Sequence, residues 1–288
     1  MNNKIVLITG ATSGIGKATA IALARKNYQI IIHGRDKQKT EQVCREIQEL
    51  TGNDKIDFLV ADLFLIKEVQ NLVDEFTKKY DRLDILINNA GGIMNKEREL
   101  TAEGVEKTMA INLFAPFLIT KLLLRLLSKS PDGRIINVSS NSHSLNANPN
   151  FYDLELVENY SPLRAYGSAK LFLIWISQHL SAKLKSEQIN NLTINTMHPG
   201  AIASNFGLES NLGSFLNLLS KLARPLLKTV EQGADTIIYL ADSPEVQHTS
   251  GSYFVNRKKE KVSVKYHSPN NETLIWEYCE KQIKKITN

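Results

Sequence analysis

Residues 5–16 read IVLITGATSGIG, and this stretch decides the fold of the 288-residue chain. The run Ile5 to Ile8 is short, continuous and apolar, as expected of a parallel strand that is buried on both faces. Three glycines follow, and the Ala-rich segment Lys17 to Lys26 has the composition of a helix. A strand, a glycine-rich turn and a helix in this order are the setting that a dinucleotide-binding motif requires.

Each glycine of this stretch has a separate task. Gly10 permits a tight turn, Gly14 lets the backbone approach a pyrophosphate, and Gly16 lets the helix pack closely on the strand. The free amide groups at the start of the helix then face the phosphates. We therefore predict a nucleotide site that is formed by Gly10, Thr12, Ser13, Gly14, Ile15 and Gly16.

The end of the second strand indicates which nucleotide binds. The strand runs from Tyr28 to His33, and Gly34, Arg35 and Asp36 follow it. An acidic side chain here would bind the ribose 2′-hydroxyl of NAD, but Gly34 has no carboxylate to repel a 2′-phosphate. Arg35 offers a guanidinium, which suits phosphate. We therefore predict NADP rather than NAD, and we interpret Asp36 as the N-cap of the next helix.

Strands and helices alternate along the rest of the first half. Further strands are expected at residues 55–60 and 83–88, with a helix between them near residues 65–80. This alternation predicts an α/β fold with a doubly wound parallel sheet, the Rossmann fold, and helices on both faces. Ligands bind such sheets at the carboxyl ends of the strands. Later strands, at residues 134–138, 192–197 and 251–255, bring the expected sheet to about seven strands.

Tyr166 and Lys170 form the first candidate for chemistry. They open an apolar run, Leu171 to Leu180, that predicts a buried helix, and residues four apart on a helix share a face. A free tyrosine is a poor acid or base at neutral pH, and a nearby cation lowers the pKa of its phenol. The pair could therefore transfer a proton, although the same spacing also fits a structural pair. Tyr160 is a weaker candidate, because its fourth neighbour is Arg164.

Asn112 is a second candidate because of a proline. The helical pattern of residues 101–128 is interrupted by Pro116, which cannot donate a hydrogen bond to the Asn112 carbonyl four residues before it. The chain should kink there and leave that carbonyl without a helical partner. The alternative is a helix break at a surface loop.

Two later strands end in polar residues. The strand at residues 134–138 ends in Ser139 and Ser140, and Ser142 and Ser144 follow. From residue types alone, any of these four serines could be a turn residue. The strand at residues 192–197 is followed by His198, Pro199 and Gly200. His198 invites a metal or catalytic role, but no histidine or cysteine has the spacing of a second ligand. We therefore expect a structural role for His198.

These motifs, taken in order, resemble the short-chain dehydrogenase/reductase family over residues 4–255. The resemblance rests on Thr-Gly-x-x-x-Gly-x-Gly at residues 9–16, Asn-Asn-Ala-Gly at residues 88–91 and Tyr-x-x-x-Lys at residues 166–170. The insert at residues 141–165 is similar to that of the retinol-dehydrogenase-like branch. The resemblance implies that Tyr166 is the acid/base, that Lys170 lowers the Tyr166 pKa and holds the nicotinamide ribose, that Ser140 positions the substrate oxygen, and that Asn112 completes a proton relay through water.

The resemblance also implies the rest of the cofactor site. An aspartate after the third strand holds the adenine amine, although Asp62 could equally cap the next helix. The loop after the fourth strand forms the adenosine pocket, and the Pro-Gly turn lies beside the nicotinamide. Ser204 stands where the family usually has threonine. The residues concerned are Asp62, Leu63, Asn89, Ala90, Gly91, Pro199, Gly200, Ile202 and Ser204.

The chain has no visible linker, so we expect one Rossmann-type domain over residues 1–288 with its core at residues 4–255. The leucine-rich segment 205–228 would lie over the active site as a substrate lid, and an apolar lid favours an apolar substrate. The same segment could be part of the core or a membrane-surface helix. Residues 256–288 form a charged C-terminal extension with one helix near residues 274–286.

The bulk composition is that of an ordinary soluble protein. Hydrophobic residues make up 42% and charged residues 23%, and the net charge of +5 is mild enough to favour a solvated surface over nucleic-acid binding. Cys44 and Cys279 are far apart and outside any metal-binding or redox motif, which indicates a reducing compartment. Without a visible signal sequence or membrane span, we expect a cytoplasmic protein.

Together these observations predict an NADP(H)-dependent enzyme that interconverts a ketone or aldehyde and an alcohol on a lipophilic small molecule. Hydride moves between the nicotinamide and the carbonyl carbon, and Tyr166 moves the proton. Two alternatives stay open: a non-catalytic NADP(H) sensor, and a peripheral membrane or scaffold protein that uses segment 205–228 and the basic tail. The resemblance implies a homodimer or a homotetramer, and no metal or nucleic acid is expected as a partner.

Overall fold

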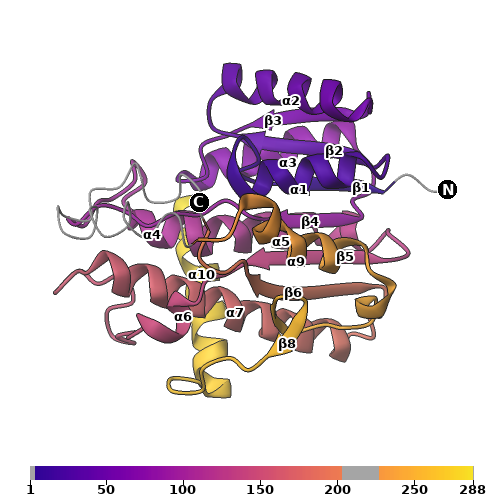
Figure 1. Cartoon of the computed structure of the whole chain (residues 1–288). Helices are drawn as coiled ribbons and strands as arrows, with labels where there is room; N and C mark the ends of the chain where they lie inside the picture. Colours follow the sequence, from indigo (N-terminus) through magenta and orange to yellow (C-terminus); the bar gives the residue numbers. More distant parts are fainter. Residues whose placement is uncertain (1–3, 203–226, 288) are drawn as a thin grey trace.

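A computed structural model describes residues 4–202 and 227–287, and an eight-stranded sheet forms its centre (Figure 1). The strand order is β3-β2-β1-β4-β5-β6-β7-β8, and all neighbouring strands are parallel except β7 and β8. The predicted doubly wound parallel sheet is confirmed, with β8 as an additional strand in the C-terminal extension. The strands are β1 (Ile5–Ile8), β2 (Gln29–Gly34), β3 (Ile56–Val60), β4 (Ile85–Asn88), β5 (Gly133–Val138), β6 (Leu192–His198), β7 (Tyr253–Val255) and β8 (Lys258–Glu260).

Helices cover both faces of the sheet and create two hydrophobic clusters. Successive residues of β1 alternate between them: Leu7 belongs to one cluster, whereas Val6 and Ile8 belong to the other. This is the period of two that a strand imposes, and both faces are apolar because helices cover both. On the Leu7 side lie α3 (Ile66–Lys79), α5 (Ala115–Leu127) and α7 (Pro162–Ser186); on the other lie α1 (Gly14–Ala24), α2 (Lys37–Thr51) and α9 (Val230–Asp242).

Local sequence signals explain where α2 begins and ends. The side chain of Asp36 accepts a hydrogen bond from the Lys39 amide at 2.8 Å, so Asp36 is the N-cap. Gly52 ends the helix in the left-handed region with φ of 67°, a conformation that glycine adopts without steric cost. The interpretation of Asp36 as a helix cap is therefore confirmed.

The proline-interrupted region is a helix with a π-helical turn. It comprises α4 (Lys107–Met109), the π-helical turn η1 (Ala110–Phe114) and α5, whose first turn holds Pro116. A π turn places one extra residue in the helix and occurs mostly as a single turn at functional sites. The predicted irregularity before Pro116 is present, and Asn112 lies in the middle of it. The helix starts later than expected from the pattern of residues 101–128.

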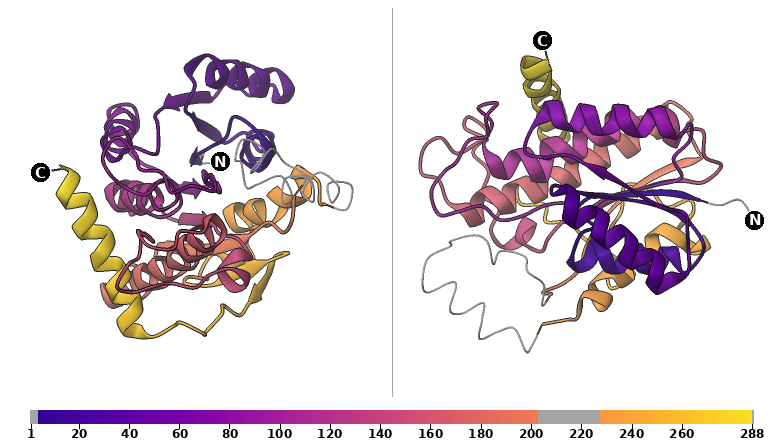
Figure 2. Two further views of the ribbon diagram at one scale, coloured as in Figure 1. Left: turned by 90° about the vertical axis from the view of Figure 1, so that its left-hand side faces the viewer. Right: turned by 90° about the horizontal axis from the view of Figure 1, so that it is seen from above.

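The C-terminal extension is part of the core. Its helix α10 (Pro269–Thr287) runs along the outer side of the layer that contains α3 and α7 (Figure 2). Ile275 and Cys279 are fully buried in the same hydrophobic cluster as Leu7, and the Trp276 ring meets the Phe117 ring edge-on at 4.8 Å. Helix α10, which lies outside the expected core of residues 4–255, therefore contributes apolar side chains to the hydrophobic core.

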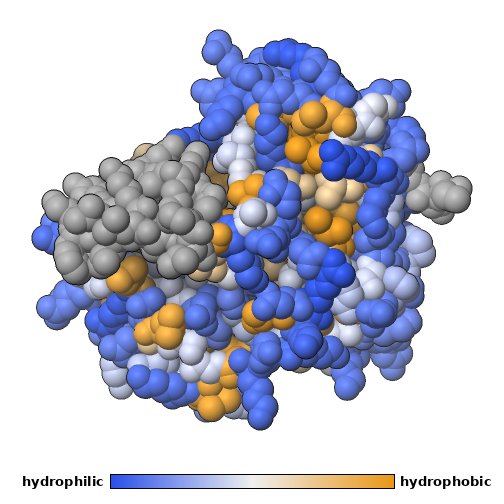
Figure 3. Space-filling model, in the orientation of Figure 1, coloured by the Kyte–Doolittle hydropathy of each residue, from blue (hydrophilic) through white to orange (hydrophobic). Residues whose placement is uncertain are grey.

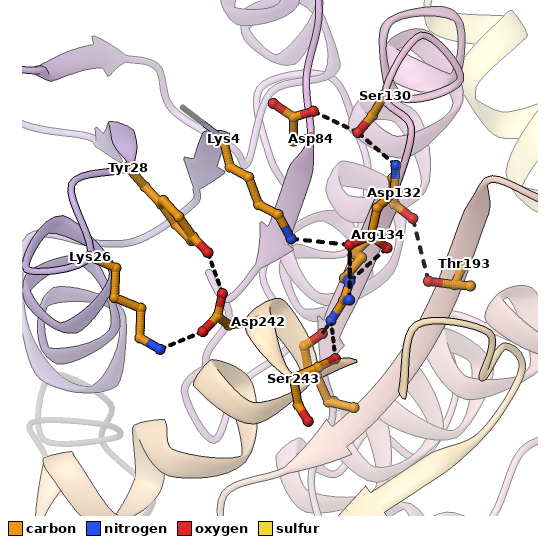
Figure 4. A network of polar contacts seen from close by, with 12 residues as sticks. Lys4, Lys26, Tyr28, Asp84, Ser130, Asp132, Arg134, Thr193, Asp242 and Ser243 are labelled. Atoms are coloured by element: carbon orange, nitrogen blue, oxygen red, sulfur yellow. Dashed lines mark hydrogen bonds and ion pairs between the residues drawn. The ribbon is translucent and has the colours of Figure 1, made fainter. Parts of the chain in front are cut away.

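A polar network fastens the edge of the sheet where the strands begin (Figure 4). The buried guanidinium of Arg134 donates to the carbonyl oxygens of Leu240 and Ser243 at the end of α9, at 3.0 and 2.8 Å. It also pairs with Asp132, which Lys4 contacts at 3.1 Å. These contacts satisfy helix-terminal carbonyl groups that have no partner within the helix.

One helical stretch within residues 4–202 and 227–287, Lys107–Leu127, is long and apolar enough to span a membrane by length and composition. Of its apolar window, 72% is buried inside the protein, as in a core helix.

Hydrophilic residues cover most of the face in Figure 3, with small hydrophobic patches among them. The absence of a membrane span stays a prediction.

Candidate functional site

The strand order reverses between β1 and β4, which is the topological switch point of the sheet. The chain proceeds from β1 to β2 and β3 on one side, and then returns to place β4 on the other side of β1. Loops that leave two adjacent strands in opposite directions open a crevice at the carboxyl ends, where open α/β sheets bind ligands. The glycine-rich loop follows β1 and residues 89–91 follow β4, so both predicted nucleotide loops lie at this point.

The glycine-rich loop needs its glycines. Gly10 and Gly14 have φ of 64° and 54°, in the left-handed region. A Cβ on Gly16 would lie 2.5 Å from the Asn89 Nδ2 atom and 2.6 Å from the Gly10 carbonyl oxygen. Ser13 precedes α1 in an extended conformation, so the first amide groups of α1 point out of the helix without helical partners. This arrangement fits the diphosphate of a dinucleotide.

Side chains from two neighbouring strands hold this loop. The Asn89 amide donates to the carbonyl oxygens of Thr9 and Gly10 at 2.9 and 3.0 Å. In return, the Thr9 hydroxyl accepts hydrogen bonds from the backbone amides of Asn89 and Ala90, both at 3.0 Å. The two loops are therefore locked to each other, and Asn89 acts through the loop backbone.

His33 is a residue of this site that the sequence reasoning missed. The Gly10 amide donates to His33 Nδ1 at 3.2 Å, and His33 Nε2 lies 3.1 Å from the Ala61 carbonyl oxygen. Since Nδ1 must accept, Nε2 carries the proton and donates to Ala61. Burial lowers the pKa of His33 to about 4, so the ring is neutral at physiological pH. The signal in the sequence was a polar histidine directly after three isoleucines of a buried strand, which indicates a side chain with a specific hydrogen-bond partner.

The residues predicted to surround the adenosine lie at the ends of β2 and β3. A Cβ on Gly34 would overlap the Thr12 and Thr40 side chains, so the position has no room for an acidic side chain. Arg35 is exposed at this strand end. Asp62 accepts a hydrogen bond from the Phe64 amide at 3.0 Å, as in a turn, and Leu63 is buried in the core. The cap of α3 is a different residue, because Glu103 accepts from the Ile66 and Lys67 amides.

The end of β5 and the start of α7 bring Ser140, Tyr166 and Lys170 together. The Tyr166 hydroxyl forms a hydrogen bond with the Ser140 side chain. Lys170 Nζ donates to the Val138 carbonyl oxygen at 2.9 Å, and the Ser139 hydroxyl donates to the Lys170 carbonyl oxygen at 3.0 Å. Three hydrogen bonds thus join the end of β5 to one turn of α7, and the Val138 carbonyl oxygen is a partner that the sequence did not indicate.

Gly167 permits this approach. A Cβ on Gly167 would lie 2.6 Å from the Ala147 amide nitrogen and 2.7 Å from the Ser142 carbonyl oxygen. These atoms belong to the segment that includes the short helix α6 (Ser142–Leu145). Glycine therefore lets the chain after Ser140 pack directly against α7, which sets Ser140 opposite Tyr166.

Burial controls the electrostatics of the pair. Burial raises the pKa of Tyr166 above its ordinary value, and the hydrogen bond with Ser140 lowers it in part. Burial lowers the pKa of Lys170 to about 7. The Lys170 ammonium lies 5.7 Å from the centroid of the Tyr166 ring. The expectation that Lys170 leaves Tyr166 with a lowered pKa is not met, because the net shift is upward and the lowering contribution comes from Ser140.

Asn112 approaches the same place from the π-helical turn. It is fully buried, and its side-chain amide donates to the Gly92 and Thr108 carbonyl oxygens at 2.8 and 2.9 Å. A Cβ on Gly91 would lie 2.6 Å from Asn112 Oδ1 and 3.0 Å from Lys170 Nζ. Gly91 therefore lies between the Asn112 and Lys170 side chains. Because glycine has no side chain, only the backbone of the loop after β4 stands between them.

The predicted nicotinamide loop follows β6. Gly200 has φ of 90°, and its amide donates to His198 Nδ1 at 2.9 Å. Ile202 reaches α9, where a Cβ on Gly233 would meet Ile202 Cδ1 at 2.8 Å and Ile15 at 3.2 Å. The Pro199–Gly200 loop and the glycine-rich loop therefore converge on one glycine of α9. Ser204 and nearly all of segment 205–228 lie outside the described residues.

Two candidates that the sequence set aside have structural partners. The Tyr160 hydroxyl lies 3.2 Å from the Thr108 hydroxyl and 3.3 Å from a Glu106 carboxylate oxygen. The His198 ring lies nearly parallel to the Tyr253 ring at 6.0 Å, and His198 Nδ1 accepts from Gly200. Among the described residues, no group of three or more histidine, cysteine, aspartate or glutamate residues could hold a metal ion.

Comparison with known proteins places this arrangement in a family. The short chain dehydrogenase family model matches residues 4–213. Human polyprenol dehydrogenase is 36% identical over 284 residues, covering 96% of this chain and 84% of that protein. Human retinol dehydrogenase 14 is 33% identical over 297 residues, covering 98% of this chain and 87% of that protein.

A solved structure agrees with these matches. It is described as a short chain dehydrogenase from Shigella flexneri complexed with NADP; it is 25% identical, covers 90% of this chain and 98% of that chain, and has a TM-score of 0.68. The family match, the relatives and the fold agree with the order of the glycine-rich loop, the loop after β4 and the Tyr166–Lys170 pair. The chain therefore belongs to the short-chain dehydrogenase/reductase family, in its retinol-dehydrogenase-like branch.

Proposed function

We propose that the protein is an NADP(H)-dependent oxidoreductase that interconverts a carbonyl compound and an alcohol on a lipophilic small molecule. The observation that carries this proposal is the placement of Tyr166, Ser140 and Lys170 on two elements tied by hydrogen bonds, with Asn112 behind Gly91. These groups lie at the carboxyl edge of the sheet, beside the loops that fit a dinucleotide.

The chain supplies the proton and holds the reacting atoms. When bound, the nicotinamide supplies a hydride to the carbonyl carbon or accepts one from the alcohol carbon. Tyr166, whose raised pKa keeps its phenol protonated at neutral pH, donates that proton to the carbonyl oxygen. Ser140 donates a hydrogen bond to the same oxygen and so positions it. Lys170, as a cation, stabilises the negative charge that forms on Tyr166 after the transfer.

The choice of NADP rests on the end of β2. Gly34 has no room for an acidic side chain, and the exposed guanidinium of Arg35 can pair with a 2′-phosphate. The Shigella flexneri relative complexed with NADP supports the same choice. Arg35, Thr12 and the first turn of α1 would hold the adenosine phosphates, and Asp62 would contact the adenine.

The lipophilic substrate class rests on the relatives. Two of them are named for polyprenol and retinol, which are alcohols on long hydrocarbon skeletons. The apolar composition of segment 205–228 suits a substrate of this class. Both free cysteines, Cys44 and Cys279, are buried, which is compatible with a reducing, cytoplasmic location.

Replacement of Tyr166 tests the proposed chemistry. Tyr166→Phe removes the proton that is transferred and keeps the ring, so we expect turnover to fall by about 10³-fold while the Kd for NADPH changes less than about twofold. NADPH oxidation would be followed with aldehydes and ketones graded by chain length. Substantial residual activity would exclude Tyr166 as the acid. NADPH binding by the wild type without oxidation of any carbonyl would favour a sensor.

Replacement of Arg35 tests the cofactor choice. We expect Arg35→Ala to weaken NADPH binding by about 10-fold or more and to change NADH binding little, because only NADPH carries the 2′-phosphate. Lys55→Ala is the matched control. Lys55 is an exposed cation that directly precedes β3, at the amino ends of the parallel strands, whereas Arg35 follows the carboxyl end of β2. Equal losses for both cofactors, or for both variants, would contradict the assignment of Arg35.

Membrane attachment is tested separately. The wild-type chain and a variant without residues 205–228 would be compared by co-sedimentation with liposomes. Sedimentation that depends on this segment, together with an absence of NADPH turnover, would favour the membrane or scaffold alternative. Light scattering would test the homodimer or homotetramer that the family resemblance implies.

A further inference from the structure

Three segments that are distant in sequence meet at the carboxylate of Glu155, in the insert before Tyr166. One oxygen, Oε2, accepts a hydrogen bond from the Glu106 amide at 2.9 Å and lies 3.6 Å from the Arg98 guanidinium. The other oxygen, Oε1, accepts from the Tyr278 hydroxyl of α10 at 2.6 Å. Glu155 therefore joins the insert, the N-terminal end of α4 and the C-terminal helix.

The next link in this chain of contacts is Glu106. Its side chain is fully buried, and it accepts hydrogen bonds from the Thr108 and Met109 amides, both at 2.8 Å. It is thus the N-cap of α4, and the Tyr160 hydroxyl donates to it at 3.3 Å. Glu155 holds the backbone of Glu106 and Tyr160 holds its side chain, so two residues of the insert fix the start of this helix.

The last link reaches Asn112. The helix that Glu106 caps continues into the π-helical turn, where the Asn112 side chain donates to the Thr108 carbonyl oxygen at 2.9 Å. Asn112 also holds Gly92 through two hydrogen bonds, beside Gly91 and Lys170. A displacement of the first turn at Thr108 would therefore move both the Asn112 side chain and the loop after β4.

The insert is built to hold Glu155 in one position. Leu156 has φ of 50°, a left-handed conformation that is costly for a branched side chain, and its side chain is only 2% exposed. Asp153 stabilises this turn, because its carboxylate accepts from the Val157 and Glu158 amides at 2.9 and 3.1 Å. Such strain persists only where surrounding contacts fix the backbone, and such sites cluster at functional places.

We propose that Glu155 is a positioning residue for the reaction: with Tyr278 and Glu106, it fixes the first turn of the helix that carries Asn112. The inference rests on the proposed function, since Asn112 matters for turnover only if the protein is a reductase or dehydrogenase. Glu155 touches no reacting atom, and it acts through the Glu106 backbone and the Thr108 carbonyl.

A double-mutant cycle on kcat tests this role. Glu155→Gln replaces one acceptor oxygen with an NH2 donor, so either the Glu106 amide or the Tyr278 hydroxyl loses its acceptor. We expect it to lower kcat by about 10-fold in the wild-type background and by less than about twofold in an Asn112→Ala background. In both backgrounds we expect the Kd for NADPH to stay unchanged. Equal losses of kcat in the two backgrounds would overturn the proposal.

A milder variant of α10 has a matched control on the same helix. Tyr278→Phe removes the hydroxyl and keeps the ring that contacts Phe114 at 5.7 Å. We expect it to lower kcat by roughly three-fold or more. Glu280→Gln removes the ion pair between Lys121 and Glu280, whose atoms lie 2.5 Å apart. This ion pair also holds α10 in place but is not part of the Glu155 network. We therefore expect Glu280→Gln to leave kcat unchanged. Equal effects of the two variants would show that α10 acts only by general packing, which contradicts the proposal.

Hydrogen exchange separates failure of this inference from failure of the proposed function. In the full chain, Glu155→Gln should speed amide exchange within residues 107–114 by about 10-fold and leave exchange in β1 and α1 unchanged. This readout needs no turnover. If the wild type oxidises no NADPH but this exchange effect is present, the proposed function fails while the positioning contact stands. Unchanged exchange in residues 107–114 would overturn the inference even in an active enzyme.

Discussion

Tyr166 and Lys170 are almost fully buried, and burial moves their pKa values in opposite directions. It raises the pKa of Tyr166 and lowers that of Lys170 to about 7, because in both cases the charged form is disfavoured. A pair in this state has a protonated phenol, ready to donate, beside an amine that titrates near neutral pH. The burial that would prepare the proposed proton transfer also costs stability, because it disfavours the charged form of each group.

That cost gives a prediction for Lys170→Met. The unfolded chain keeps the lysine proton up to its ordinary pKa of 10.5, whereas the folded protein releases it near 7, so the unfolded state binds more protons between these values. The free energy of unfolding of the wild type therefore rises with pH across this window. We expect Lys170→Met to be more stable than the wild type at pH 6 by about 2–4 kcal/mol, with the difference shrinking towards pH 10.

Urea denaturation at pH 6, 7.5 and 9 measures this effect. Lys185→Met is the control, because Lys185 lies on the same helix with an exposed side chain. A stability difference for Lys170→Met that stays constant over the three pH values would show that Lys170 is not protonated differently in the two states.

Gly91 gives a second prediction at the residue scale. A methyl group there would lie 2.6 Å from Asn112 Oδ1 and 3.0 Å from Lys170 Nζ, so Gly91→Ala must displace one of them. We expect a loss of activity of at least about 100-fold, since misplacement of about 1 Å has this effect on catalysis. Gly92→Ala is the neighbouring control, because its methyl group would meet only the flexible end of Met94, at 3.2 Å. Steady-state kinetics on both variants would decide, and equal losses would contradict this account.

Two helices, α3 and α9, are capped by side chains from distant segments. Glu103 accepts from the first amides of α3, and Arg134 donates to the last carbonyl groups of α9. Both use the charge that suits the helix end, anionic at the start and cationic at the end. Such caps satisfy the free backbone groups at the end of a helix. They also fix the position of that helix relative to a distant part of the chain.

Arg134→Met tests the strength of the cap on α9. The change removes a buried cation, leaves the Leu240 carbonyl without that donor, and deprives Asp132 of one of its two cationic partners. We expect the free energy of unfolding to fall by about 3–5 kcal/mol. Arg45→Met should change it by less than about 1 kcal/mol, because Arg45 and Glu41 form an exposed pair within one helix.

Chemical denaturation of both variants gives the comparison. A loss for Arg134→Met no larger than that for Arg45→Met would mean that the network in Figure 4 contributes little to stability. NADPH binding should survive Arg134→Met at temperatures where the variant is folded, because the network lies at the opposite edge of the sheet from the glycine-rich loop.

On the scale of the whole molecule, the amino ends and the carboxyl ends of the parallel strands carry different features. The edge where strands begin is held by the Arg134 network, and the edge where strands end carries the glycine-rich loop, residues 89–91, Ser140 and the Pro199–Gly200 loop. The parallel arrangement enforces this division, since the carboxyl ends of β1 to β7 emerge on one side. Helix α10 then covers the outer side of the α3 and α7 layer (Figure 2). Its Tyr278 hydroxyl donates to Glu155 in the insert before Tyr166.

The sequence by itself determined the features that depend on neighbouring residues. The glycine-rich turn after Ile8, the cap at Asp36, the order of strands and helices and the Tyr166–Lys170 pair all follow from local backbone geometry and from the periods of strand and helix. The irregular helix at Asn112 could be predicted because Pro116 lacks a donor within the same helix. The catalytic roles of these residues stay a proposal.

Only the tertiary structure decided the contacts between distant segments. It showed that Ser140 and burial set the Tyr166 pKa, that His33 supports the Gly10 loop, and that α10 belongs to the core. The hydrogen bond from Tyr278 to Glu155 joins residues 123 positions apart. No local pattern in the sequence encodes such a pair, because its geometry arises from the packing of whole elements, and desolvation depends on how completely that packing excludes water.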